Sequence, residues 1–95
     1  MAQFEFTDAT STGRSNVITL SNLGPRGGST ERTVYIRGIT TGTVQVQLSP
    51  IGQNDWVTPT DGEFTADGQI TVVGGGDISL NISVATSVDV SGWIE

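Results

Sequence analysis

Strict alternation of apolar and polar side chains is the feature of this sequence that most restricts its fold. It is clearest over residues 43–49 and 78–84. A period of two places successive side chains on opposite faces of a β-strand. The side chains predicted to face a core are Val44, Val46, Leu48, Ile78, Leu80, Ile82 and Val84. Those predicted to face outward between the last four are Ser79, Asn81 and Ser83.

Short segments of this kind follow one another along the whole chain. The expected strands are residues 4–6, 17–20, 33–39, 43–49, 56–58, 63–65, 69–73, 78–84 and 87–94. Turn residues separate them, and the longest expected loop is 21–31. Turns every 8–12 residues are typical of antiparallel sandwiches and small barrels. We therefore expect an all-β fold, an antiparallel β-sandwich of jelly-roll or Ig-like type with about eight short strands.

Length and composition restrict the classes of protein that fit. Ninety-five residues form one domain, 1–95, in which residues 1–13 could be an extended N-terminal arm. The net charge is −6, with four Arg and no Lys, so nucleic acid and anionic membranes are poor partners. The N-terminus lacks the basic and apolar regions of a signal peptide, which predicts synthesis in the cytoplasm.

No residues with the spacing of a catalytic or metal site occur in the chain. There is no Cys and no His, and without Lys an ordinary general base for a Ser or Thr nucleophile is lacking. As a cluster, Asp61, Glu63 and Asp67 could pair as general acid and base or form a weak Ca²⁺ site. Their turn-rich segment lacks apolar walls and misses the EF-hand spacing, so we expect them to be solvated turn acids. The triplet 74–76 is Gly-rich without a following Lys or helix, which predicts a hairpin turn. We expect no enzyme activity, no cofactor and no bound metal.

Aromatic and Arg side chains are the best candidates for a binding surface. Interfaces favour such anchors, so we expect Tyr35, Arg37 and Trp93 at an interface, with Arg26 and Trp56 as further candidates. Whether Trp93 faces the core or the surface depends on a bulge at Gly92. The alternative use of Tyr35, Trp56 and Trp93 is a flat platform on which a sugar ring stacks.

Sheet edges in this sequence lack the usual protection against pairing with other chains. Natural sandwiches place charges, Lys above all, or Pro along their edges. Here Lys is absent, and many strand residues are Thr, Ser, Gln or Asn. The sequence therefore favours self-association over a free monomer.

One stretch of the chain resembles a known group of proteins. Ser49, Gly52, Asn54 and Trp56, followed by Val- and Thr-rich closing strands over 69–90, are similar to small β-sandwich structural proteins of tailed-phage virions. The resemblance implies a capsid decoration (cement) protein, located in the virion, that forms homo-oligomers, often trimers, and binds a capsid shell protein. A tail or fibre accessory domain and a carbohydrate-binding β-sandwich module are the alternatives.

Overall fold

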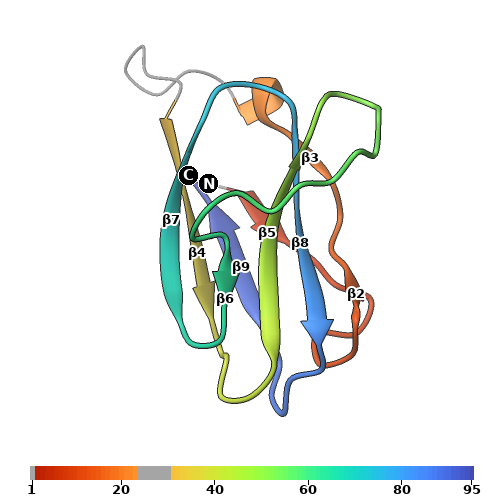
Figure 1. Cartoon of the computed structure of the whole chain (residues 1–95), viewed down its shortest axis with the longest axis vertical. Coiled ribbons are helices and arrows are strands. Elements are labelled where there is room, and N and C mark those ends of the chain that lie inside the picture. The colour runs from red at the N-terminus through yellow and green to blue at the C-terminus, as the bar shows by residue number, and fades with distance from the viewer. Residues whose placement is uncertain (1, 24–30) are drawn as a thin grey trace.

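Two antiparallel sheets lie face to face in the computed structural model, which describes residues 2–23 and 31–95 (Figure 1). The four-stranded sheet has the order β1 (Ala2–Phe4), β9 (Ser91–Ile94), β4 (Glu31–Arg37), β7 (Gly68–Val73). The other sheet has the order β2 (Gly13–Arg14), β8 (Asp77–Val84), β5 (Thr43–Ser49), β6 (Glu63–Phe64), and β3 (Ile18–Thr19) also pairs with β8. A short 3-10 helix, η1 (Leu20–Leu23), follows β3. The all-β prediction is confirmed.

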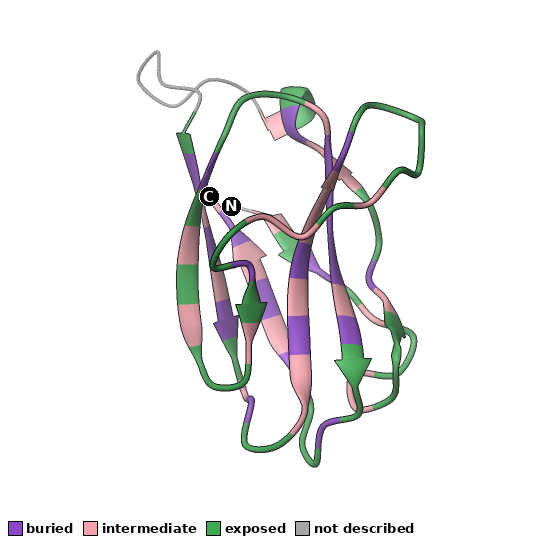
Figure 2. Cartoon of the chain, in the orientation of Figure 1, coloured by how far each residue is buried: buried purple, intermediate pink, exposed green. Residues whose placement is uncertain are grey.

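The core lies between the sheets and is almost purely aliphatic. Buried and more exposed residues alternate along β4 and β5, as the pleat of a strand requires (Figure 2). Side chains that are fully or almost fully buried come from both sheets: Phe4, Val34, Ile36, Val44, Val46, Ile78, Leu80, Ile82 and Ile94. Six of the seven predicted inward side chains belong to this core or pack against it.

Two predictions about β8 are wrong. Val84 is 54% exposed, because it stands at the last position of the strand, beyond the buried part of the sheet. Ser79 faces outward as its phase requires, yet it is completely buried. The chain segment after β2 covers it: Ser79 Oγ lies 3.1 Å from Ser15 Oγ and donates to Ser15 O at 3.2 Å.

The N-terminal segment is part of the sandwich from residue 2 onward, and not an extended arm. β1 pairs with the C-terminal strand β9, and Phe4 lies opposite Gly92. The Phe4 side chain is 2% exposed and belongs to the core. The expected strand at 4–6 is thus found two residues earlier, and β2 lies between the expected strands 4–6 and 17–20, where the sequence predicts no strand.

Several other strands are shorter than predicted. The expected strand 56–58 is reduced to one bridge between Val57 and Leu48. The expected strand 87–94 begins only at Ser91. Val88 lies before the strand, and its side chain is exposed. The pairing of β9 passes through Gly92 without a register shift, so no bulge forms there.

Gly42 tests how tightly the β4–β5 turn is fixed. Its φ is +89°, and a Cβ there would strike the carbonyl oxygen of Ala85 and lie 2.6 Å from that of Val84. Gly74 has a similar φ of +102° but open space around it. We expect Gly74→Ala to lower the free energy of unfolding by about 1–2 kcal/mol through backbone strain alone. Gly42→Ala should cost at least about 1 kcal/mol more, because backbone must shift.

Urea unfolding followed by tryptophan fluorescence measures both losses. Gly75→Ala, at a position without positive φ and without neighbours within 4 Å, is the control and should change little. Equal losses for Gly42→Ala and Gly74→Ala would show that the close approach to Ala85 does not constrain the turn.

Candidate functional site

A row of four side chains crosses the outer face of the four-stranded sheet. The strand register aligns Gln3 with Trp93, Trp93 with Tyr35, and Tyr35 with Gln69. Trp93 faces outward because its neighbours Gly92 and Ile94 are buried in the core. Both aromatic residues are half-buried, and both glutamines are exposed. We call Gln3, Trp93, Tyr35 and Gln69 the aromatic row.

Arg37 lies beside the aromatic row and is held in place by backbone oxygens. Its Nη1 donates to the carbonyl oxygens of Ile36 and Gly68, each at 2.9 Å. Its Cζ is 5.7 Å from the centre of the Tyr35 ring. The Tyr35 hydroxyl donates to Glu95 Oε2 at 2.9 Å. The structure thus brings together three of the predicted interface residues, Tyr35, Arg37 and Trp93, on one flat surface.

The remaining two interface candidates are not part of this surface. Trp56 follows β5 and lies over the other sheet, where its ring is 4.4 Å from Arg14 Cζ. The predicted platform of Tyr35, Trp56 and Trp93 is therefore not assembled, because the sandwich separates the rings. Arg26 lies outside the described residues.

Polar side chains form a hydrogen-bonded network on the outer face of the other sheet. Arg14 Nη2 donates to Gln47 Oε1 at 2.6 Å, and Gln47 Nε2 donates to Thr58 Oγ1 at 3.0 Å and Gln45 Oε1 at 3.4 Å. Asn81 Nδ2 also donates to Gln45 Oε1, at 3.2 Å, and Gln45 Nε2 donates to Glu63 Oε2 at 3.2 Å. We call this set the amide network; its members are Arg14, Gln45, Gln47, Thr58, Glu63 and Asn81.

The hydrogen bonds of the amide network run from a charged donor, Arg14, at one end to a charged acceptor, Glu63, at the other. Register aligns Arg14 with Asn81, Asn81 with Gln45, and Gln45 with Glu63 across β2, β8, β5 and β6. The amide groups of Gln47 and Gln45 each accept from the Arg14 side and donate toward the far side of the sheet, so each amide orientation is fixed by its neighbours. Sequence reasoning missed Arg14, although the outward phase of Gln45, Gln47 and Asn81 was a usable signal.

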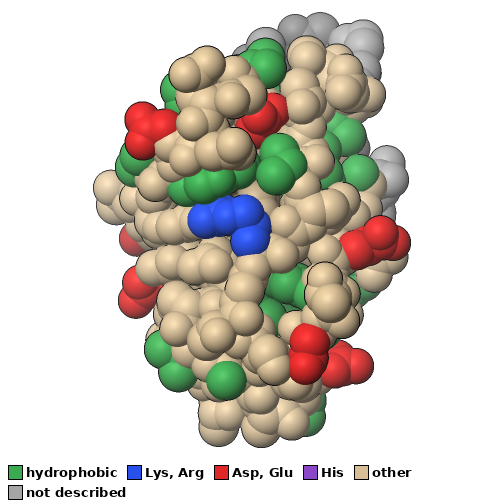
Figure 3. Space-filling model, turned by 90° about the vertical axis from the view of Figure 1, so that its right-hand side faces the viewer, with side chains coloured by type: hydrophobic (Ala, Val, Ile, Leu, Met, Phe, Trp, Pro, Cys, Tyr) green, Lys and Arg blue, Asp and Glu red, His purple; other side chains and the backbone are tan. Residues whose placement is uncertain are grey.

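Arg14 is the member of the network with incomplete bonding. Its Nη1 is buried and has no hydrogen-bond partner among the described residues. Burial lowers the pKa of Arg14 from its usual value, because desolvation disfavours the charged form. In the space-filling view of this side of the molecule, one basic group lies near the middle, and acidic groups lie above it, below it and to both sides (Figure 3).

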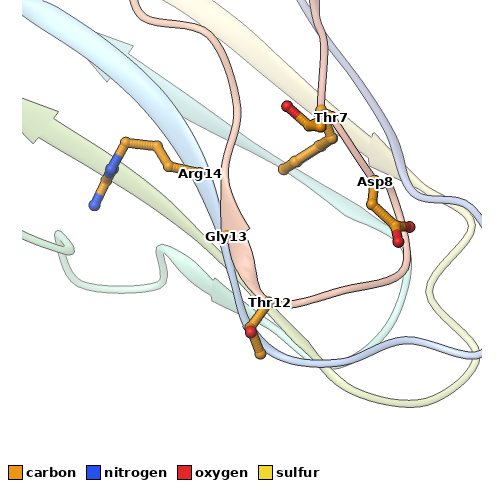
Figure 4. A pocket seen from close by; sticks show the side chains of 6 residues that line it. Thr7, Asp8, Thr12, Gly13 and Arg14 are labelled. Carbon is orange, nitrogen blue, oxygen red and sulfur yellow. The ribbon is translucent and has the colours of Figure 1, made fainter.

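A cavity of about 330 Å³ lies beside β2 but does not gather reactive groups. Phe6, Thr7, Asp8, Thr12, Gly13 and Arg14 line it. The Arg14 side chain points away from Thr7 and Asp8 (Figure 4). The Asp8 carboxylate accepts from the backbone N–H of Thr10 at 3.0 Å and the Ser11 hydroxyl at 2.9 Å. These bonds, the Thr10 N–H first, lower the pKa of Asp8. The Asp8 carboxylate therefore stabilises its own turn.

The three acids considered as a cluster have separate structural roles. Glu63 accepts from Gln45 in the amide network, and Asp67 Oδ1 accepts the backbone N–H of Ile39 at 2.8 Å. Asp61 occupies a turn position with φ +64°. Across residues 2–23 and 31–95, no three Asp, Glu, His or Cys side chains lie close enough together to hold a metal ion. The Gly-rich segment 74–76 is the turn between β7 and β8.

Asp77 fixes the turn that precedes Trp56. The Asp77 side chain is 6% exposed; its Oδ2 accepts the backbone N–H of Gly52 at 3.0 Å and its Oδ1 accepts from Thr19 Oγ1 at 2.8 Å. The N–H of Gly52, and then the Thr19 hydroxyl, lower the pKa of Asp77. A second bond, from the N–H of Asp55 to Ser49 Oγ at 2.9 Å, closes the turn next to Trp56.

Comparisons with known proteins add no family to this description. A scan against family models, a search of curated proteins and a search of solved structures each found no match to this chain. Among the described residues, no helix has the length and apolar character that a membrane crossing requires.

Asp77→Asn tests the link between this carboxylate and the turn. Because the folded-state pKa lies below the ordinary 3.8, the carboxylate stabilises the fold above about pH 4, and this contribution disappears as the pH falls through the folded-state pKa. We expect Asp77→Asn to lower Tm by several degrees at pH 7, and the difference from the parent to shrink at about pH 2–3. Asp89→Asn, at an exposed turn position, is the charge-matched control. A Tm difference independent of pH would contradict this assignment.

Proposed function

We propose that this chain is a non-enzymatic structural protein of a phage virion, most specifically a capsid decoration protein that self-associates and binds the shell. The observation that supports this best is the aromatic row with Arg37 beside it. Tyr, Trp and Arg are the residues enriched at the energetic centres of protein interfaces. Here they lie side by side on the outer face of the four-stranded sheet, where Trp93 pairs with Tyr35 and the Arg37 guanidinium lies 5.7 Å from the Tyr35 ring.

The size of this surface fits a protein that works in an array. Four strands about 4.8 Å apart, of 3, 4, 7 and 6 residues, present roughly 300 Å². A stable interface of standard size covers about 800 Å² on each partner. Association through the aromatic row alone is therefore weak, and a repeating shell that presents many sites would strengthen it through high local concentration. A trimer, as the family resemblance implies, would present several copies of the aromatic row to the shell and would strengthen weak binding in the same way.

A sugar-binding module is the second candidate, because Tyr35 and Trp93 lie side by side. A sugar ring could stack on such a pair. The Arg37 guanidinium beside Tyr35 and the Glu95 carboxylate on its hydroxyl suit a protein interface equally well. Tryptophan fluorescence titrated with a glycan panel separates the two functions, since only the sugar module should respond.

Trp93→Ala tests the proposed interface. We expect sedimentation equilibrium to show a concentration-dependent oligomer of the parent, and Trp93→Ala to weaken association by about tenfold or more, as the loss of an interface anchor does. Arg37→Ala should act in the same direction with less effect on the fold, since Arg37 is exposed. Trp56→Ala, on the other sheet, is the matched control.

Two results would contradict the proposal. One is a parent chain that stays monomeric at the highest concentration reached. The other is an oligomer that the Trp93 and Arg37 substitutions leave unchanged, whereas Trp56→Ala causes it to dissociate into monomers. Genome context gives an independent check: we expect the gene to lie beside a major capsid gene.

A further inference from the structure

The guanidinium of Arg14 has an N–H group for which the described chain supplies no acceptor. Nη1 is the single buried side-chain nitrogen or oxygen of residues 2–23 and 31–95 that lacks a hydrogen-bond partner. The other half of the group is fixed, because Nη2 binds Gln47 Oε1 at 2.6 Å and Cζ lies 4.4 Å from the Trp56 ring. Buried donors without acceptors are rare in folded proteins. Arg14 is therefore positioned to receive an acceptor from another molecule.

The surroundings of Arg14 select a carboxylate as that acceptor. A guanidinium presents paired donors that match the two oxygens of a carboxylate or a phosphate. A polyanion such as nucleic acid would also meet the carboxylates of Glu63 and Asp55 and the chain's net charge of −6. A sugar would need a free aromatic face, whereas the guanidinium already covers one face of Trp56. A single carboxylate brings one negative charge and needs no free ring face, so it satisfies both restrictions.

The amide network prepares the site for such a group. Gln47 holds Arg14 by its oxygen and is itself held by Thr58 through its amide nitrogen, so the guanidinium cannot turn freely. The sole carboxylate in the network, Glu63, is engaged by Gln45 and leaves Arg14 unpaired. The charge of Arg14 is therefore not neutralised within the network.

We propose that the Arg14 guanidinium, held by Gln47 and covered by Trp56, is a binding site for one carboxylate, supplied by an Asp or Glu side chain of a protein partner. The site rests on the proposed function only in taking the partner to be a protein. It lies on the opposite sheet from the aromatic row, so a chain that self-associates through that row keeps this site free for a different protein.

Binding at this site requires the indole of Trp56 to move. Nη1 has less than 1 Å² of exposed surface, and the Trp56 ring is stacked on the guanidinium. Trp56 lies on the connection between β5 and β6, which is attached near this point by the Leu48–Val57 bridge. A carboxylate that reaches Nη1 displaces the ring, and the Trp56 indole resonance therefore reports binding.

An NMR titration of the full ¹⁵N-labelled chain tests the site. The probe is N-acetylglutamate amide, and N-acetylglutamine amide is the control of nearly the same shape without charge; Trp93→Phe assigns the two indole signals. We expect a saturable shift of the Trp56 indole N–H with the first probe and none with the second. Arg14→Gln should weaken binding by about tenfold or more. Arg37→Gln, which removes the other ring-stacked Arg, should leave binding unchanged.

Arg14→Lys serves if Arg14→Gln does not fold, and should also weaken binding, because Lys lacks the planar pair of donors. Equal response to both probes, no saturable shift, or unchanged binding by the Arg14 variants would overturn the site. A shift of the Trp56 indole signal with glucose as large as that with glucuronate would assign the surface to sugars instead.

Sedimentation of Arg14→Gln separates the carboxylate site from the proposed self-association. This variant should associate like the parent, whatever the titration shows.

Discussion

Packing of the two sheets against each other is the constraint on which the rest of the structure depends. Val34, Ile36 and Ile94 from one sheet and Val46 and Leu80 from the other have no exposed surface. Among the described residues, the buried side chains of this core are aliphatic apart from Phe4. The two candidate sites lie on the outer faces, where the strand register decides which side chains become neighbours.

The two outer faces have different physical characters. On one, the aromatic row places two rings between two exposed glutamines, and backbone oxygens hold Arg37 beside them. On the other, the amide network joins a cation to a carboxylate through oriented side-chain amides. Flat aromatic surface is suited to broad contact, whereas a fixed guanidinium is suited to recognising one group. Under the two proposals, each outer face would contact a different partner.

Sequence alternation predicted the strands at 43–49 and 78–84, because alternation depends on neighbours along the chain. It could not predict that Ser79 is buried, since the cover comes from Ser15, 64 residues away. The pairing of Trp93 with Tyr35, and the reach of Arg14 to Trp56, depend in the same way on strand order. Turn residues limit strand order but do not determine it.

Hydroxyl-radical footprinting over a dilution series tests the central claim, that the outer faces and not the interior carry the function. The account predicts that oxidation of Trp93 and Tyr35 falls as the chain concentration rises, because the aromatic row becomes covered, while oxidation of Trp56 stays constant. Oxidation of all three that is independent of concentration, or protection of Trp56 alone, would contradict it.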